Sequence, residues 1–579
     1  MLRNLKRIWP YLWKYRRGWA VGLSSLILKD VTGALLPLVV RYAIDALTSG
    51  KRLQVIAGLA LLLIAVSLIK GFFQYWMRLI LVGISRDVEY DIRNDLFGRL
   101  VTLSPGFFAR SQTGDLMARS TNDLNAVRMM LGPGIMYWTE TSLTFLLAIG
   151  IMVFSDWRLA LLALLPAPLV SFNVIFFGQR IHSRFQKIQE MFSDISSRVQ
   201  ENLSGVRMVR AFAQEDAEIR RFEKLNRAYI AQNLRLARLQ GTFEPLLEAL
   251  IGLTFVAVLW AGGRQVLQHR ISLGSFVMFN TYMSILVWPM IALGWVVNLM
   301  QRGTASLTRI LEILDQVPAI ATPPDPAPCG EVRGDISFEN VTVEYMAGRA
   351  LGPIDLTIRA GSTVAIVGRT GSGKSTLVNL IPRLLDPNAG VVRLDGIDAR
   401  RLDLQSLRAQ IGMVPQETFL FSATIAENIA FGMETATREA VESAAELAGL
   451  ASDIEGFPNG FETMVGERGL TLSGGQKQRT AIARAVVLNP RILILDDALS
   501  SVDTLTEDRI LSGLAHVVAG RTVILISHRV STVRSADEIV VLDKGRIVER
   551  GTHEELIARA GYYADLAQKQ TLEEELEAI

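Results

Sequence analysis

Three short stretches of the sequence place residues able to bind phosphate or a cation directly after an apolar run. In the first, "STVAIVGRTGSGKSTLVNLI", residues 363–367 are expected to form a buried strand, and glycines then lead into a helix near Ser375. The pattern G-x-x-x-x-G-K-[S/T] in this context predicts a loop whose backbone N–H groups hold phosphate oxygens, with Lys374 on the β- and γ-phosphates and the Ser375 hydroxyl on Mg²⁺. A plain glycine-rich turn is the alternative, which the intact flanking pattern disfavours. The predicted phosphate-binding residues are Gly368, Arg369, Thr370, Gly371, Ser372, Gly373, Lys374, Ser375 and Thr376.

The other two stretches end in a carboxylate pair and in an imidazole. "RILILDDALSSVD" passes from Ile and Leu residues to Asp496 and Asp497, and "RTVILISHR" ends its apolar run just before His528. In a phosphate-loop enzyme, an aspartate that ends such a strand makes a second contact to Mg²⁺, which is the role predicted for Asp496. A histidine at the carboxyl end of a parallel strand is well placed to contact the γ-phosphate. A lone histidine is more often structural, and that alternative stays open.

The segment "LSGGQKQR", residues 472–479, has two interpretations. Ser473 is a good N-cap for a helix that runs to Leu488. With the glycines that follow, it is equally suited to start a second phosphate-binding helix. One chain cannot easily apply both helix starts to one nucleotide, because they would have to converge from opposite sides, whereas a second copy can supply the opposite face. The residues concerned are Ser473, Gly474, Gly475 and Gln476.

The composition of the chain changes near residue 301. Of its 579 residues, 50% are hydrophobic and only 20% charged, which is too apolar for an ordinary soluble enzyme, and the net charge of +3 gives no reason to expect nucleic-acid binding. The single cysteine, Cys329, excludes an intrachain disulfide and fits a reducing compartment. The Pro-rich stretch 318–334 is typical of an extended linker. We therefore expect an all-α membrane domain over 1–317, a linker over 318–334 and an α/β phosphate-loop domain over 335–579.

Six apolar segments in the first half are long enough to cross a bilayer, which takes about 20 apolar residues. One such segment alone could be a buried core helix, but six together favour membrane spans. Lys and Arg concentrate before the first span and in the connections between spans two and three and spans four and five, which predicts that both termini face the cytoplasm. The predicted spans are 19–47, 55–84, 135–154, 159–177, 243–267 and 273–300.

The two long cytoplasmic connections are expected to continue the spanning helices. A helical arm of about 25 residues would extend roughly 35 Å beyond the membrane. Short turn segments would then lie far from the bilayer, ready to contact another domain. The candidate turn segments are 113–123 and 201–212.

Together these motifs resemble those of ATP-binding cassette (ABC) transporters, specifically exporter half-transporters with six membrane helices ahead of one nucleotide-binding domain. The resemblance covers nearly the whole chain. It implies a bacterial cytoplasmic-membrane exporter with ATP and Mg²⁺ as cofactors, and a dimer that holds two ATP molecules head to tail between its nucleotide-binding domains. It adds Gln416 in "MVPQETF" as a catalytic residue and Mg²⁺ ligand, Tyr345 as the aromatic stacked on adenine, and Asp503 in "SSVD". It also implies that segment 465–469 meets the turn segments named above.

The sequence departs from the family pattern at position 497. The family normally has Glu there, as the base that orients the attacking water, and Asp497 is shorter by one methylene. Such a carboxylate lies roughly 1 Å too far back, and a misplacement of that size can cost about 10²-fold in rate. The signature at 472–476 is unaltered. We therefore expect a heterodimer whose other subunit carries Glu. The alternatives are a homodimer that uses Asp497 as a slower base, and an ATP-gated regulator or channel without uphill transport.

The sequence says least about the substrate, for which a hydrophobic or amphipathic drug or lipid is our expectation. Charged residues inside spans are costly and tend to be functional. The alternative is that they pair with one another or lie at cytoplasmic depth. The charged candidates are Lys29, Asp30, Glu140, Glu244 and Glu248, and the aromatic candidates for a substrate cavity are Trp76, Trp138, Phe279 and Trp288.

Overall fold

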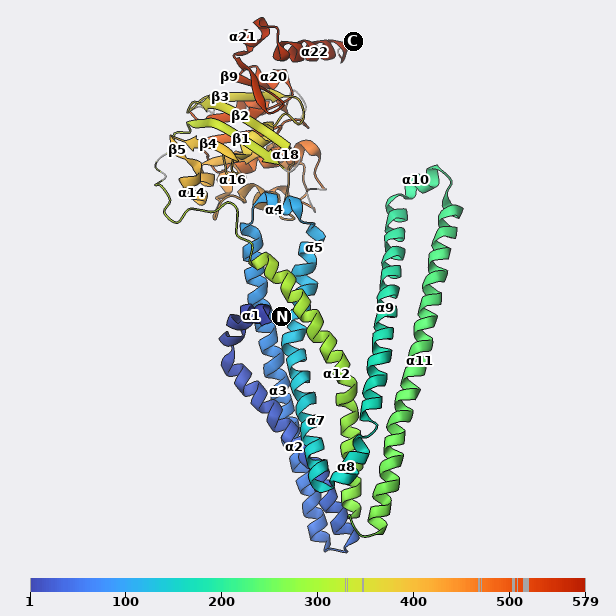
Figure 1. Cartoon of the computed structure of the whole chain (residues 1–579). Helices are drawn as coiled ribbons and strands as arrows, with labels where there is room; N and C mark the ends of the chain where they lie inside the picture. The colour runs from blue at the N-terminus through green and yellow to red at the C-terminus, as the bar shows by residue number, and fades with distance from the viewer. Residues whose placement is uncertain are drawn as a thin grey trace. The chain divides into compact units, whose positions relative to one another are not determined.

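The computed structural model describes residues 2–328, 330, 332–345, 348–466, 469, 471–501, 506–507, 509–513 and 520–577. The chain divides into two compact units, which Figure 1 shows coloured along the sequence. The first unit consists of Met1–Val101 and Gln112–Gln316. The second consists of Thr102–Ser111 and Val317–Ile579.

Helices make up the described part of the first unit. Six long helical segments are apolar enough to cross a membrane, and each contains one predicted span in the predicted order. The prediction of six membrane helices is therefore confirmed. The helices are α1 (Leu2–Lys14), α2 (Arg16–Thr48), α3 (Leu53–Thr102), α5 (Thr113–Ala118), the π-helix η1 (Arg119–Asp123), α6 (Leu124–Met129), the π-helix η2 (Met130–Gly134), α7 (Ile135–Ser155), α8 (Trp157–Leu164), α9 (Ala167–Ser204), α10 (Val206–Ala211), α11 (Glu215–Leu267) and α12 (Leu273–Leu314).

The end of α2 is fastened to the start of α12. The Asp45 carboxylate accepts hydrogen bonds from the Ser272 hydroxyl (2.8 Å) and from the backbone N–H of Gly274 (2.9 Å). Ser272 also caps α12 by accepting from the N–H of Ser275. A Cβ at Gly274 would lie 2.2 Å from the Arg41 carbonyl oxygen, so only glycine allows the two helices to approach this closely. These contacts fix the start of α12 against the end of α2, on the side of the membrane where short loops connect the spans.

Helices α9 and α11 form a long antiparallel pair, as the sequence predicted for the second connection (Figure 1). Near its tip, Arg198 lies 2.6 Å from Glu218, and the Asn202 amide donates to the same carboxylate. The short helix α10 caps the pair and contains no buried residue. The predicted contact of segment 201–212 with another domain stays a prediction.

The first predicted turn segment, 113–123, is helical and not a turn, and its predicted contact with another domain stays a prediction. Those residues form α5 and η1, and they belong to the first unit. The part that belongs to the second unit is Thr102–Ser111, which contains the helix α4 (Pro105–Arg110). Pro105 occupies a first-turn position of α4, where its missing N–H costs no helical hydrogen bond. The interruption between the long helices therefore lies between the end of α3 at Thr102 and the start of α5 at Thr113, and not within 113–123.

A charged network then ties α5 and η1 to the last turns of α12. The Ser306 hydroxyl donates to Asp123 (2.8 Å), and Arg309 forms ion pairs with Asp123 (3.1 Å) and with Asp115. Arg119 bridges to the exposed carboxylate of Glu312 at 3.0 Å. The network joins the two stretches of the first unit that lead directly into the second unit.

Replacing Asp123 by alanine is expected to open this network locally. The buried Ser306 hydroxyl and Arg309 lose their shared acceptor, which costs about 1–3 kcal/mol and raises the frequency of local opening about 5-fold or more. Hydrogen–deuterium exchange of α5 and the end of α12 measures the effect. Glu312→Ala is the matched control: its ion pair is exposed, so exchange should change less than about threefold. Equal exchange in the two variants would show that the buried aspartate is not the anchor.

The described residues of the second unit form two sheets. A four-stranded antiparallel sheet has the order β2-β1-β4-β5, and a six-stranded sheet has the order β10-β9-β3-β8-β7-β6, parallel except for β10. The strands are β1 (Ile336–Tyr345), β2 (Gly348–Ile358), β3 (Thr363–Gly368), β4 (Ala389–Leu394), β5 (Ile397–Asp398), β6 (Ile411–Val414), β7 (Ile492–Asp496), β8 (Thr522–Ile526), β9 (Glu538–Asp543) and β10 (Arg546–Gly551). Besides α4, the described helices of the second unit are α13 (Lys374–Asn379), η3 (Ala399–Arg401), α14 (Leu404–Ala409), α15 (Ile425–Ala430), α16 (Arg438–Leu447), α17 (Ala451–Glu455), η4 (Gly460–Glu462), α18 (Gly474–Val486), α20 (Val530–Val533), α21 (His553–Ala558) and α22 (Tyr562–Glu577).

The parallel strands are buried on both faces. In β3, Val364 and Ile366 enter a core shared with β1 and β2, whereas Ala365 and Val367 enter a second core that includes residues of α18. This explains why the strand sequences are continuous apolar runs and do not alternate. Because the carboxyl ends of parallel strands meet at one edge, the residues that follow β3, β6, β7 and β8 come together there.

Candidate active site

The glycine loop between β3 and α13 depends on two close backbone approaches. Gly373 has φ +102°, and a Cβ there would lie 2.6 Å from Leu351 Cδ2 and 2.9 Å from the Ala350 carbonyl oxygen. A Cβ at Gly368 would lie 2.1 Å from the Leu542 carbonyl oxygen. Gly371 also has a positive φ, +80°, but faces open space. Only glycine therefore fits at both ends of the loop, as the sequence pattern predicted.

Lys374 lies inside this loop. Its Nζ donates to the carbonyl oxygens of Gly368 (2.8 Å) and Arg369 (3.1 Å), and burial lowers the pKa of its ammonium. The Ser372 hydroxyl is buried in the same loop without a hydrogen-bond partner among the described residues. A buried hydroxyl that lacks a partner is unfavourable unless a bound group supplies one. The loop thus fits a phosphate group, which would accept hydrogen bonds from both side chains.

One pocket of about 290 Å³ brings together most of the predicted site residues. It is lined by residues from the glycine loop and from the ends of β1, β6, β7 and β8. The lining residues are Tyr345, Ala350, Thr370, Gly371, Gly373, Lys374, Ser375, Thr376, Gln416, Asp496, Asp497, Ile526 and His528. Tyr345 is half exposed at its rim. Gly368, Arg369 and Ser372 belong to the loop but do not line this pocket.

The pocket contains the oxygen donors that Mg²⁺ prefers. Asp496 is the last residue of β7 and is 3% exposed. Burial raises the pKa of its carboxyl group, and the Ser375 hydroxyl and Lys374 act in the opposite direction. The Ser375 hydroxyl, the Gln416 amide oxygen and the Asp496 carboxylate line the same space and suit a hard cation. A bound ion there would balance the negative charge of the aspartates and of a phosphate group.

Asp497 is held by its backbone at both ends. Its N–H donates to the Ile526 carbonyl oxygen (2.9 Å), and its own carbonyl accepts from the Ser500 hydroxyl (3.0 Å). Its φ of +52° lies in the left-handed region, which aspartate adopts more readily than most residues. The backbone therefore cannot move forward to compensate for the short side chain.

His528 follows β8 and has a partner that the sequence analysis missed. Its carbonyl oxygen accepts from the Gln570 amide of α22, and the Gln570 side-chain oxygen accepts from the N–H of Val530 (2.7 Å). The C-terminal helix thus holds the backbone at His528 and two residues after it. No sequence signal marks Gln570, which is one polar residue in an ordinary helix.

The signature residues do not line this pocket. Ser473 caps α18 in a reciprocal capping box with Gln476, which agrees with the helix-start interpretation. The Gln476 amide also donates to Asp453 (3.0 Å), a partner that sequence reasoning did not find. The interpretation in which Ser473, Gly474, Gly475 and Gln476 bind a second copy's nucleotide stays a prediction. Asp503 lies outside the described residues, as do Glu467 and Arg468 of segment 465–469.

Two known protein families match this chain, one in each half. A model described as the ABC transporter transmembrane region matches residues 19–290, and one described as ABC transporter matches residues 351–500. The chain belongs to the ABC transporters. An ABC exporter couples ATP hydrolysis to transport, so the predicted family, ATPase activity and ATP-driven export are confirmed.

Full-length relatives extend the match over almost the whole chain. It is 38% identical to the "Probable multidrug resistance ABC transporter ATP-binding/permease protein YheI" of Bacillus subtilis (strain 168), over 99% of this chain and 98% of that protein. It is 37% identical to the "Multidrug resistance-like ATP-binding protein MdlA" of Escherichia coli (strain K12), over 98% and 97%. An "ATP-dependent lipid A-core flippase" of Syntrophus aciditrophicus (strain SB) is 36% identical over 96% and 93%.

A solved structure shows the same fold. The structure of a bacterial Atm1-family ABC exporter with ATP bound matches with a TM-score of 0.79 and 30% identity, over 96% of this chain and 98% of that chain. With six spanning helices and bacterial exporter relatives, this ABC transporter subunit is a multi-pass protein of the inner membrane.

Proposed function

We propose that this chain is one half of a heterodimeric ABC exporter, in which its own phosphate loop binds Mg-ATP but hydrolyses it slowly. The observation that carries the proposal is Asp497, which stands where the family normally has Glu and whose backbone is fixed to Ile526 and Ser500. A carboxylate set back by about 1 Å loses about 10²-fold in rate. The binding groups Lys374, Ser375 and Asp496 are all present in the pocket.

In this assembly the remaining site residues take the roles that the family implies. Gln416 and Asp496 join Ser375 as ligands of Mg²⁺, Tyr345 stacks on adenine, and His528 contacts the γ-phosphate. Ser473 to Gln476 complete the nucleotide site of the other subunit, where a glutamate supplies the base. Because ATP is cytoplasmic, the nucleotide-binding domain and both termini face the cytoplasm, as the distribution of Lys and Arg predicts.

We propose a hydrophobic or amphipathic small molecule as the substrate. The names of three relatives point to drugs or to lipid A-core. Six spans with few charges offer a mostly apolar environment, which suits molecules that partition into the bilayer.

Purification of the full chain expressed alone tests the proposal. In lipid nanodiscs it should bind ATP and turn it over at no more than about one hundredth of the rate of an exporter site that carries glutamate. Co-expression with a similar half that carries Glu should restore turnover and drive uptake of a labelled substrate into inverted vesicles. Brisk hydrolysis by the chain alone, abolished in Asp497→Asn, would instead establish the homodimer.

A further inference from the structure

A polar cavity lies among the membrane-spanning helices of the first unit. Helices α2, α3, α7 and α12 enclose a volume of about 260 Å³. Its wall carries two cationic and two anionic side chains: Lys29, Asp30, Lys70 and Glu140. Ionisable groups are costly at membrane depth, and those that persist there usually line a cavity or a pathway. The cavity therefore needs a function other than packing.

Three of these groups form an ion-paired cluster, which was one alternative left open by the sequence. Lys29 Nζ lies 2.8 Å from Asp30 Oδ1 and 2.5 Å from Glu140 Oε1. The pairing satisfies Lys29 but not both carboxylates, because Asp30 Oδ2 is buried and has no hydrogen-bond partner among the residues that the structure describes. A buried carboxylate oxygen without a donor is unfavourable. A cationic or N–H-bearing group of a ligand would supply that donor.

Lys70 brings a second positive charge from the neighbouring helix. It lies against Gly33 of α2, where a Cβ would be 3.4 Å from Lys70 Cε and 3.7 Å from its Nζ. Within the described part of the chain, Lys70 has no carboxylate partner, unlike Lys29. Among the described residues, the cavity therefore contains a cation without a carboxylate partner and an unsatisfied carboxylate oxygen.

The polar groups lie at one depth in the membrane. We count the distance of each group along its helix from the helix end next to a short loop, at 1.5 Å per residue. These ends are Thr48 of α2, Leu53 of α3 and Ser155 of α7. By this count Lys29, Lys70 and Glu140 lie about 22–28 Å from those ends. Since the hydrocarbon core is about 30 Å thick, this depth is close to the opposite boundary. That boundary is on the side from which the chain continues into the nucleotide-binding domain. Polar head groups of the adjacent leaflet lie at the same depth.

The size of the cavity decides how much of a ligand it can hold. Sites for whole drug-sized molecules measure about 300–1,000 Å³, so 260 Å³ suits a head group better than an entire amphiphile. Trp288 lines the cavity and is 59% exposed, which leaves an apolar surface for an attached chain. Phe279 is fully buried in a neighbouring apolar core and is not available to a ligand. Glu244 and Glu248 are exposed on α11 and do not line the cavity.

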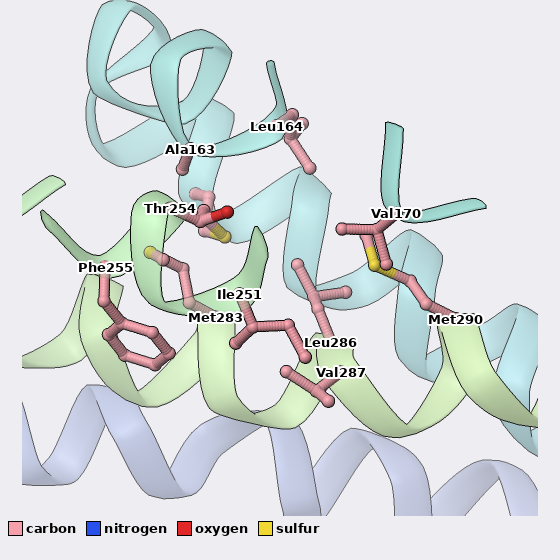
Figure 2. A pocket seen from close by; sticks show the side chains of 11 residues that line it. Ala163, Leu164, Val170, Ile251, Thr254, Phe255, Met283, Leu286, Val287 and Met290 are labelled. Carbon is pink, nitrogen blue, oxygen red and sulfur yellow. The ribbon is translucent and has the colours of Figure 1, made fainter. Parts of the chain in front are cut away.

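A second cavity nearby shows the contrast. Figure 2 shows its lining, which comes from α7, α8, α9, α11 and α12 and contains Thr254 as its one labelled polar side chain. Its volume of about 40 Å³ has room for no more than a few water molecules. It is a packing defect, whereas the polar cavity has both the space and the charges to hold a ligand.

We propose that the polar cavity binds the zwitterionic head group of a membrane amphiphile. The anionic group of the ligand pairs with Lys70, and its cationic group donates to Asp30 and Glu140, while the hydrocarbon chain lies outward along Trp288. A zwitterion leaves the cavity neutral, whereas a ligand with a single charge leaves one of the two sides unsatisfied. This inference rests on the proposed export function, because the head group in the cavity would be that of the exported substrate.

Direct binding to the purified full-length chain in dodecyl maltoside, without nucleotide, tests the inference separately from hydrolysis. The probes are radiolabelled lysophosphatidylethanolamine, dodecyl methyl phosphate (a phosphodiester with one negative charge), dodecylamine and water-soluble glycerophosphoethanolamine. We expect lysophosphatidylethanolamine to bind at least 10-fold more tightly than each of the other three. Equal affinity for the two single-charge amphiphiles and the zwitterion would overturn the proposal. Equal affinity for glycerophosphoethanolamine would overturn its membrane source.

Variants of Lys70 test whether this residue binds the anionic group of the ligand. Lys70→Gln should weaken binding of lysophosphatidylethanolamine about 10-fold and leave dodecylamine unchanged, and Lys70→Arg should retain most of the binding. Arg78→Gln is the matched control, because Arg78 is an exposed cation on the same helix that does not line the cavity. An equal loss in the Lys70 and Arg78 glutamine variants would show that the effect is general electrostatics and would overturn the assignment.

Discussion

Replacing Asp497 by glutamate is expected to raise the rate of ATP hydrolysis at this chain's own phosphate loop by about 10²-fold. The added methylene carries the carboxylate forward by about 1 Å, to where the family places its base. The backbone cannot make the same adjustment in the natural chain, because the Asp497 N–H is bonded to Ile526 across the sheet. Single-turnover hydrolysis of pre-bound Mg-ATP, in the assembled exporter, measures the rate at this site.

Asp497→Asn is the control for that gain. If the natural aspartate does not act as a base, its neutral isostere should hydrolyse ATP within about twofold to threefold of the natural rate, since a positioned base alone is worth about 10²–10⁴-fold. Nucleotide affinity should remain similar in all three proteins, because Lys374, Ser375 and Asp496 are unchanged. A large loss in Asp497→Asn combined with no gain in Asp497→Glu would establish aspartate as the working base.

Replacing Gly373 by alanine is expected to weaken Mg-ATP binding by about 10²-fold or more. A left-handed φ alone costs an alanine about 1–2 kcal/mol. The new Cβ would also lie 2.6 Å from Leu351 Cδ2 and 2.9 Å from the Ala350 carbonyl oxygen, so the loop would have to move away from β2. That movement displaces the start of α13 and Lys374, which together hold the phosphates. Equilibrium binding of a fluorescent ATP analogue measures the loss.

Gly396→Ala separates loop displacement from backbone strain. Gly396 also has a positive φ, +80°, but a Cβ there meets nothing within 4 Å, and the residue lies outside the nucleotide pocket. Gly396→Ala should lose about as much stability through backbone strain as Gly373→Ala does, and it should bind ATP normally. Normal ATP binding by Gly373→Ala, at equal thermal stability of the two variants, would contradict the geometric account of the loop.

Local sequence signals predicted the parts of the fold that local physics determines. The six spans follow from long apolar runs, and the glycine loop follows from positions such as Gly368 and Gly373, where a Cβ cannot fit. The gathering of Asp496, Gln416 and His528 in one pocket follows from parallel strands that end at a common edge. In each case one short pattern and one geometric rule are sufficient.

Features that depend on distant contacts could not be predicted. The break between the long helices lies at α4 and not at 113–123, because α3 ends at Thr102 and Ser104 and Pro105 begin a separate short helix. The anchoring of His528 by Gln570 joins residues far apart in the chain, and neither carries a motif for it. The clustering of Lys29 with Glu140 likewise depends on how α2 packs against α7, which no periodicity reveals.

The chemical state of the nucleotide held by this chain shows directly whether its own phosphate loop binds ATP but hydrolyses it slowly. The assembled exporter is incubated with Mg²⁺ and a photoreactive ATP analogue radiolabelled on its α-phosphate, cross-linked during steady turnover, and separated into its subunits. We expect the label on this chain to be mostly triphosphate and the label on the partner to be mostly diphosphate. Diphosphate on both subunits in equal amount would contradict this expectation.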